Sequence, residues 1–189
     1  MKMVKNIMGW IAHIMVCIAI AMAIVVFVVQ LTYVKGYSME PTLHDGDRII
    51  VSKIQRSLGI RPGYGDIVVV DSRVRMSRNI LDLFRDYLKN NMLAYWMTGK
   101  EPDTIFIVKR VIGKPGDKLE YLKGRMYVNG NPIDEPYLRE PMAWFPEVEV
   151  IVPENHYFVM GDNRNESCDS RMIGFIPFSH ILGTFLVRF

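Results

Sequence analysis

Two residues of this chain are of types that could together cleave a peptide bond. Ser38 follows Gly36 and Tyr37 in a segment that continues through a proline at residue 41. Lys109 lies within residues 105–112, where the two-residue period of a strand places it on one face with apolar neighbours. A serine nucleophile needs an adjacent base, and a lysine can be that base only when it is neutral. Desolvation among apolar side chains lowers a lysine pKa and so favours the neutral amine.

Each residue also has a simpler interpretation. A serine beside glycine and proline is usually a turn residue, and Lys109 with Arg110 could mark a solvated strand edge. A third segment, residues 161–171, is rich in Gly, Asn, Asp and Ser. That composition predicts an ordered loop held by side-chain to backbone hydrogen bonds and acid–arginine pairs. Such a loop could supply a hydroxyl that orients the lysine, although the pattern alone does not show that it does.

The elements that must position these residues are mostly short strands. Apolar runs at 48–51, 66–70, 104–112, 125–128, 157–160 and 184–187 are typical of strands, and Asn129-Gly130 predicts a hairpin turn. No parallel strand–helix–strand rhythm is present. Residues 79–97 break the pattern, with apolar residues spaced three and four apart as in an amphipathic helix. That helix could pack on the strands or lie on anionic lipid.

Residues 7–30 are expected to form a membrane anchor. From residue 7 to residue 29 the only polar or ionisable side chains are Trp10, His13 and Cys17. A helix of that length is about 35 Å long, enough to cross a bilayer. The run is longer than the apolar region of a cleaved signal peptide and lacks a small-x-small cleavage site after it. Basic residues before it predict a cytoplasmic segment 1–6 and an extracytoplasmic domain over 31–189.

Composition argues against several other classes of function. Lys2 and Lys5 precede the anchor, which leaves 21 of the 23 Lys and Arg residues against 20 Asp and Glu in the rest of the chain. This balance gives no indication of nucleic-acid binding. Cys17 lies in the expected anchor and Cys168 outside it, so they cannot pair with each other. No His, Cys or acidic cluster has metal-ligand spacing, and we expect neither a metal nor a cofactor.

Four segments, in this order after one amino-terminal apolar run, resemble those of the bacterial type I signal peptidases. The segments are residues 38–43, 65–70, 109–117 and 161–171. The resemblance covers the chain from the anchor to the carboxyl end, except for about 72–103, a helical insertion. A lysine at position 109, where some relatives carry histidine, is similar to the Ser–Lys branch. The resemblance implies a mostly β fold: a transmembrane helix followed by a twisted antiparallel β catalytic domain.

The resemblance also implies roles for individual residues. Ser38 would attack the scissile carbonyl, and Lys109 would take its proton and later activate water. Ser167 would hydrogen-bond Lys109, while Asp169 and Arg171 would hold the loop. Some relatives place a serine two residues before the nucleophile as an oxyanion donor; this chain has Gly36 there. The residues expected to line pockets for small substrate side chains are Met39, Leu43, Ile107 and Val108.

The implied partners are signal peptides of exported preproteins and the lipid bilayer, and the implied location is the bacterial cell membrane. Two alternatives remain open on sequence grounds. A Ser–Lys peptidase with a different substrate would share the mechanism. A membrane-tethered β binding module without catalysis would not require Ser38 and Lys109 to be close, so a separation under about 5 Å would exclude that alternative.

Overall fold

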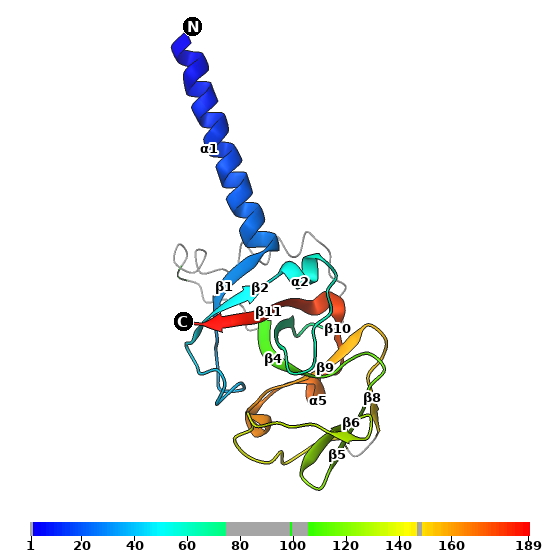
Figure 1. Ribbon diagram of the computed structural model, residues 1–189. Coiled ribbons are helices and arrows are strands. Elements are labelled where there is room, and N and C mark those ends of the chain that lie inside the picture. The colour runs from blue at the N-terminus through cyan, green and yellow to red at the C-terminus, as the bar shows by residue number, and fades with distance from the viewer. Residues whose placement is uncertain (1, 75–98, 100–105, 147–148) are drawn as a thin grey trace.

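The computed structural model describes residues 2–74, 99, 106–146 and 149–189 (Figure 1). The predicted helix over 79–97, most of the insertion at about 72–103, and the start of the strand predicted at 104–112 lie outside the described residues. The helices and strands of the described residues, with η for a 3-10 helix, are in chain order α1 (Lys2–Phe27), β1 (Val29–Tyr33), β2 (Arg48–Ser52), α2 (Ile54–Ser57), β3 (Ile67–Asp71), β4 (Phe106–Gly113), β5 (Lys118–Leu122), β6 (Arg125–Val128), β7 (Asn131–Pro132), β8 (Val150–Ile151), β9 (His156–Met160), η1 (Arg164–Glu166), α5 (Ser170–Ile173), β10 (Ile176–Pro177), η2 (Phe178–His180) and β11 (Ile181–Arg188).

The amino-terminal helix α1 extends away from the β-rich part of the chain (Figure 1). It ends at Phe27, and β1 begins at Val29, so the last residues of the expected anchor belong to a strand instead. Backbone pairing explains the difference, because β1 runs antiparallel to β2 from Val29 opposite Ser52 to Tyr33 opposite Arg48. Over the residues that the structure describes, no helix combines the length and hydropathy needed to cross a bilayer.

The expected mostly β, antiparallel fold is confirmed. A seven-stranded sheet has the order β1-β2-β11-β3-β4-β9-β10, and a four-stranded sheet has the order β7-β6-β5-β8. The strands predicted around residues 48–51, 66–70, 125–128, 157–160 and 184–187 correspond to β2, β3, β6, β9 and β11. The Asn129-Gly130 turn connects β6 to β7, with positive φ at both residues as that hairpin type requires.

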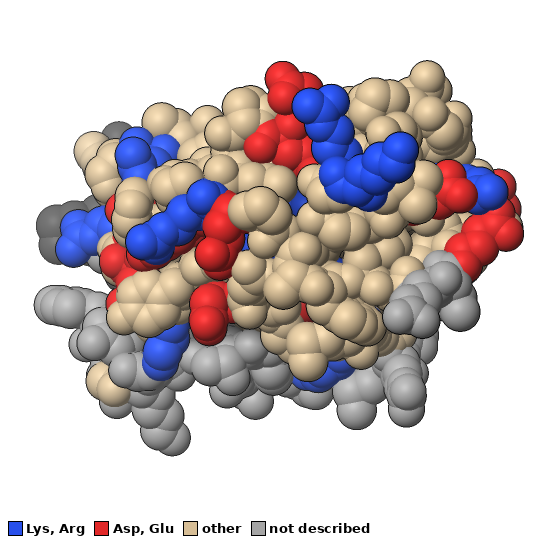
Figure 2. All heavy atoms as spheres, turned by 90° about the horizontal axis from the view of Figure 1, so that it is seen from below, with Lys and Arg blue, Asp and Glu red and all other residues tan. Residues whose placement is uncertain are grey.

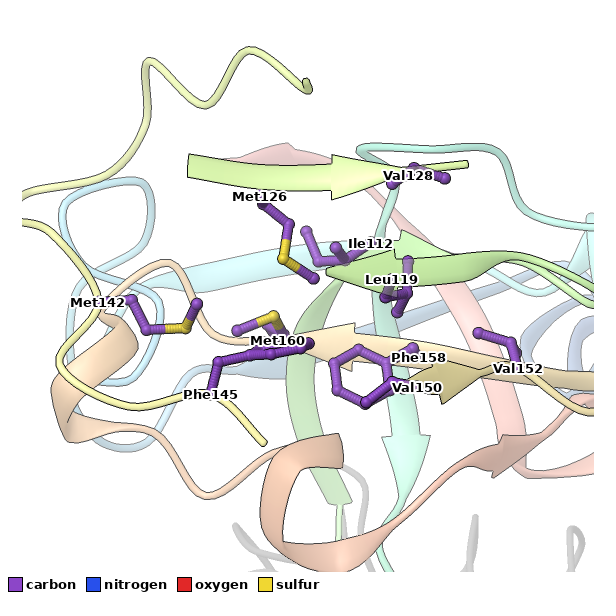
Figure 3. Close-up of a cluster of buried hydrophobic side chains, with 10 residues drawn as sticks. All are labelled: Ile112, Leu119, Met126, Val128, Met142, Phe145, Val150, Val152, Phe158 and Met160. Carbon is purple, nitrogen blue, oxygen red and sulfur yellow. The ribbon is translucent and has the colours of Figure 1, made fainter. Parts of the chain in front are cut away.

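Three clusters of buried apolar side chains hold these sheets together. One packs the four-stranded sheet onto β4 and β9, with Leu119, Met126 and Met160 fully buried (Figure 3). A second lies among β2, β3 and the loop after β1, and it includes Met39 and Leu43. A third forms on Val68, Val70, Val111 and β9. Strand β4 contributes to all three clusters or packs against them, which fixes the strand that carries Lys109.

The face of the molecule farthest from α1 carries acidic and basic side chains next to one another (Figure 2). Mixed pairs of this kind include Lys118 on β5, whose Nζ lies 2.8 Å from Oε1 of Glu149 and 3.4 Å from Oε1 of Glu120. Exposed pairs of this kind contribute little to stability. The mixture agrees with the nearly equal numbers of acidic and basic residues after the amino-terminal segment.

Candidate active site

Ser38 lies in the loop between β1 and β2, and that loop is fixed at both ends. Backbone bonds join Val34 to Asp47 and Gly46 to Val34 where the loop closes. Within it, the N–H of Leu43 donates to the carbonyl of Met39 at 2.9 Å, and both side chains are buried in the core. The apolar neighbours of Ser38 therefore anchor the loop, while the serine itself stays partly exposed.

Lys109 reaches Ser38 from β4. It lies opposite Val68 in the β3–β4 pairing, and only 2% of the residue is exposed to solvent. Its Nζ donates a hydrogen bond to Oγ of Ser38 at 2.6 Å, although 71 positions separate the two residues in the sequence. When the amine is neutral, its lone pair can accept the hydroxyl proton across the same contact.

Burial makes a neutral Lys109 accessible near physiological pH. Desolvation lowers the pKa of Lys109 from 10.5 to about 8, and it outweighs the negative charge of Asp169, which raises it. With a pKa of about 8, roughly one lysine in ten is neutral at pH 7; at 10.5 the fraction would be about one in three thousand. Burial therefore increases the fraction of neutral Lys109 at pH 7 about 300-fold.

An ion pair ties the strand of the lysine to the loop at 161–171. Arg110 points away from Lys109 and donates to both carboxylate oxygens of Asp162, from Nε at 2.7 Å and from Nη2 at 2.6 Å. The hydroxyl of Thr42 donates to the same carboxylate. Asp162 is 1% exposed, and a bidentate pair in that setting has a fixed geometry. We call Thr42, Arg110 and Asp162 the clamp.

The next residue of the loop contacts the nucleophile segment directly. The backbone N–H of Asn163 donates to the carbonyl of Ser38 at 3.1 Å, and its side-chain amide donates to the carbonyl of Tyr37 at 3.2 Å. The clamp and Asn163 together connect the nucleophile loop, β4 and the 161–171 loop.

Asp169 and Arg171 hold the rest of the loop. Asp169 is fully buried, caps α5, and pairs with Arg171 through Nε and Nη2, each at 2.8 Å. It also accepts from the N–H of Gly161 at 3.1 Å. Arg171 donates in addition to the carbonyl of Arg164. The pair therefore closes the loop on itself.

The hydrogen bond expected between Ser167 and Lys109 is not formed. Oγ of Ser167 is buried and has no hydrogen-bond partner within the described part of the chain. It packs against Gly161, where an added Cβ would overlap both Oγ of Ser167 and the carbonyl oxygen of Ser38. The glycine thus allows Ser167 and the nucleophile segment to approach each other, and Ser167 lies close to Ser38 without a hydrogen bond to Lys109.

The residues expected to line substrate pockets fall on two faces. Met39 and Leu43 are each 1% exposed, in the cluster against which Val108 also packs. Ile107 packs on the opposite side, against the third cluster. The pleat causes this split, because adjacent residues of β4 point to opposite faces.

Strand β4 also has an open edge beside Lys109. One edge pairs with β3 from Phe106 to Arg110. On the other edge, pairing with β9 begins only at Arg110. Among the described residues, no strand pairs with that second edge from Phe106 to Lys109. An extended peptide added there would lie next to the lysine.

The structure also gives roles to residues that the sequence left without one. Gly36 donates its N–H to Oδ1 of Asp45 at 2.6 Å, so that group is already engaged and is not a free oxyanion donor. Thr42, Arg110 and Asp162 lay within the segments singled out, but nothing in the sequence pairs residues 52 or more positions apart. The one available signal was the strand period, which turns Arg110 away from Lys109 and so requires a separate partner for it.

Comparisons with known proteins place the chain in a family. A family model described as signal peptidase, peptidase S26, matches residues 7–189. A probable signal peptidase I-2 of Synechocystis sp. is 36% identical over 91% of this chain and 68% of its own length. A signal peptidase I of Bacillus licheniformis is 33% identical over 95% of this chain and 87% of its own. A solved signal peptidase I from Enterococcus faecalis is 25% identical, covering 67% of this chain and 97% of its own, with a TM-score of 0.44.

Proposed function

This chain belongs to the signal peptidase family, peptidase S26, and from that membership we propose how its residues carry out the reaction. It is a serine endopeptidase that cleaves signal peptides from preproteins. We assign Ser38 as the nucleophile and Lys109 as the general base. The observation that carries this assignment is the 2.6 Å contact between Oγ and a buried Nζ whose pKa is lowered to about 8.

In the first half of the reaction, neutral Lys109 accepts the proton of Ser38 as Oγ attacks the scissile carbonyl. The tetrahedral intermediate collapses to an ester on Oγ, and the lysine ammonium gives its proton to the departing amine. In the second half, neutral Lys109 takes a proton from water, whose oxygen attacks the ester. Collapse of this intermediate releases the signal peptide as an acid and returns the proton to Oγ. The base is unchanged over one cycle.

The remaining site residues support this pair. The backbone N–H of Ser38 is the proposed oxyanion donor. Asp169 and Arg171 keep the 161–171 loop closed, as their paired contacts indicate. Ser167 is proposed to support the site by packing: its buried hydroxyl lies against Gly161, beside the carbonyl oxygen of Ser38.

The substrate is proposed to bind extended along the open edge of β4, between Phe106 and Lys109. Main-chain hydrogen bonds to a sheet edge bind a peptide without demanding particular side chains. Selection then comes from small pockets for the side chains one and three residues before the cut. Both of these substrate side chains point to one face of an extended peptide, so their proposed lining is Met39, Leu43 and Val108, which share a cluster. Ile107, which was also expected to line a pocket, packs on the opposite face of β4.

We further propose that α1 is a transmembrane anchor, with the amino terminus cytoplasmic and the catalytic domain extracytoplasmic. The support is the apolar sequence of residues 7–29 and the exposure of large apolar side chains along α1, including Ile11, Ile14 and Ile18. Side chains of this kind are stable outside a protein core when lipid surrounds them. The lipid bilayer is therefore a proposed partner of the chain.

The test is cleavage of a preprotein by the purified full chain in detergent, with the cut mapped by mass spectrometry. We expect one cut, at the end of the signal peptide, and loss of cutting in Ser38→Ala. Ser57→Ala, at an exposed serine in α2, is the matched control and keeps full activity.

Cutting by Ser38→Ala above a few per cent of wild type would remove Ser38 as the nucleophile. A cut elsewhere in the preprotein would favour a Ser–Lys peptidase with another substrate. Membership of peptidase S26 argues against the non-catalytic binding module, and the 2.6 Å contact supports the Ser38–Lys109 assignment.

A further inference from the structure

The connection between β7 and β8 contacts the catalytic segments at several points. Two side chains near its start, Glu135 and Tyr137, reach Arg164 and Arg110. Further on, the N–H of Ala143 donates to the side chain of Asn165 at 2.8 Å, and Arg171 donates to the carbonyl of Trp144 at 3.2 Å. Nothing in the proposed reaction uses this connection, which belongs to the four-stranded sheet.

Glu135 is the partner of a buried charge in the 161–171 loop. The side chain of Arg164 has no exposed surface, and it forms an ion pair with the carboxylate of Glu135, which is 7% exposed. Nε of Arg164 also donates to the carbonyl of Gly161 at 3.1 Å. A buried guanidinium without a partner is strongly destabilising, so Glu135 is required wherever Arg164 is present.

Tyr137 connects Glu135 to the clamp. Its hydroxyl donates to Oε1 of Glu135 at 3.0 Å. Its ring covers the guanidinium of Arg110, with Cζ 3.9 Å from the ring centroid. The edge of that guanidinium donates to Asp162, so its flat face is covered while its N–H groups are engaged. Burial raises the pKa of Tyr137, with the charge of Glu135 adding to the effect, so the phenol remains a neutral donor.

We propose that Tyr137 is a positioning residue for the Ser38–Lys109 pair, acting through the guanidinium of Arg110. The ring restrains Arg110, Arg110 orients Asp162, and Asn163, the next residue, bonds the carbonyl of Ser38. Arg110 also follows Lys109 directly in β4. The proposal rests on the assignment of Ser38 and Lys109 made above, and it gives the second sheet a part in the reaction.

The experiment compares variants of Tyr137 in the full chain, measuring kcat, KM and Tm. Tyr137→Leu removes the ring, and we expect kcat to fall roughly threefold to thirtyfold with little change in KM, as loss of a partly buried cation–π contact predicts. Tyr137→Met is the second variant, because its long side chain retains more of the packing. Tyr137→Phe keeps the ring and should stay within about threefold of wild type. Tyr127→Leu, a half-buried tyrosine on β6 away from the site, is the control with unchanged kcat.

A double-mutant cycle separates positioning from general destabilisation. If Tyr137 acts through Arg110, Tyr137→Leu should lower kcat no further once Arg110→Lys is present. Multiplicative losses in the double variant, or a normal kcat in both Tyr137→Leu and Tyr137→Met, would overturn the proposal. Ser38→Ala run alongside distinguishes the two levels of argument. If Ser38→Ala is inactive while Tyr137→Leu and Tyr137→Met are both fully active, the reaction assignment stands and only the role of Tyr137 is removed.

Discussion

Replacing Lys109 with methionine tests whether burial of this lysine lowers the free energy of unfolding of the protein. The lysine is 2% exposed, and its pKa is lowered to about 8 chiefly by desolvation. A charge that burial disfavours destabilises the folded state, whereas a methionine of similar length fills the same space without one. We therefore expect Lys109→Met to be inactive and yet more stable than wild type. Ser38 is partly exposed, so its hydroxyl can bond to water once the amine is gone.

The size of the effect follows from the pKa. A decrease from 10.5 to about 8 corresponds to roughly 3 kcal/mol at about 1.4 kcal/mol per unit. The folded state binds fewer protons than the unfolded state between those values, so wild-type stability rises with pH through that window. The destabilisation of the wild type by the buried ammonium is complete below about pH 8 and disappears above about pH 10.5. The advantage of Lys109→Met should therefore be about 3 kcal/mol near pH 6 and smaller by roughly 1.4 kcal/mol near pH 9.

The assay is urea unfolding of the chain from residue 28 onward, near pH 6 and near pH 9, in wild type and Lys109→Met. Taking the difference between the two proteins removes the titration of the groups that they share. Lys123→Met, in the exposed turn between β5 and β6, is the matched control and should change the free energy of unfolding by less than about 0.5 kcal/mol. A Lys109→Met protein that is less stable than wild type, or whose advantage does not depend on pH, would refute the argument from burial.

Three further outcomes are expected. First, kcat/KM should rise with pH through an apparent pKa near 8. Lys109→Arg should be inactive because a guanidinium does not release its proton, and near-normal turnover by that variant would contradict the assignment of the base. Second, Gly161→Ala should lower kcat at least tenfold, because its methyl group would overlap Ser167 and the nucleophile segment; kinetics unchanged from wild type would show that the loop can relax. Third, removing residues 1–27 should leave an active enzyme in detergent, whereas removing 1–31 also deletes much of β1 and should lower Tm; equal Tm values would mean that β1 contributes nothing.

Local sequence patterns determined much of this protein. Strands such as β3 and β6 were predicted because their apolar runs end at turn residues, and the Asn129-Gly130 hairpin because positive φ is needed there. The resemblance singled out Ser38 and Lys109, and strand alternation placed Lys109 on an apolar face opposite Arg110. These features depend on residues close together in the chain, so their spacing alone carries the information.

Tertiary structure decided everything that depends on residues far apart in the chain. The pairing of β1 with β2 shortened the expected helix, because backbone partners overrode an apolar composition equally suited to either element. Folding brought Asp162 to Arg110 and placed Tyr137 over the same guanidinium. It also left Ser167 without its expected bond to Lys109. Spacing in the sequence cannot fix such contacts, because a hydrogen bond or an ion pair depends on positions set by the whole core to within a fraction of an ångström.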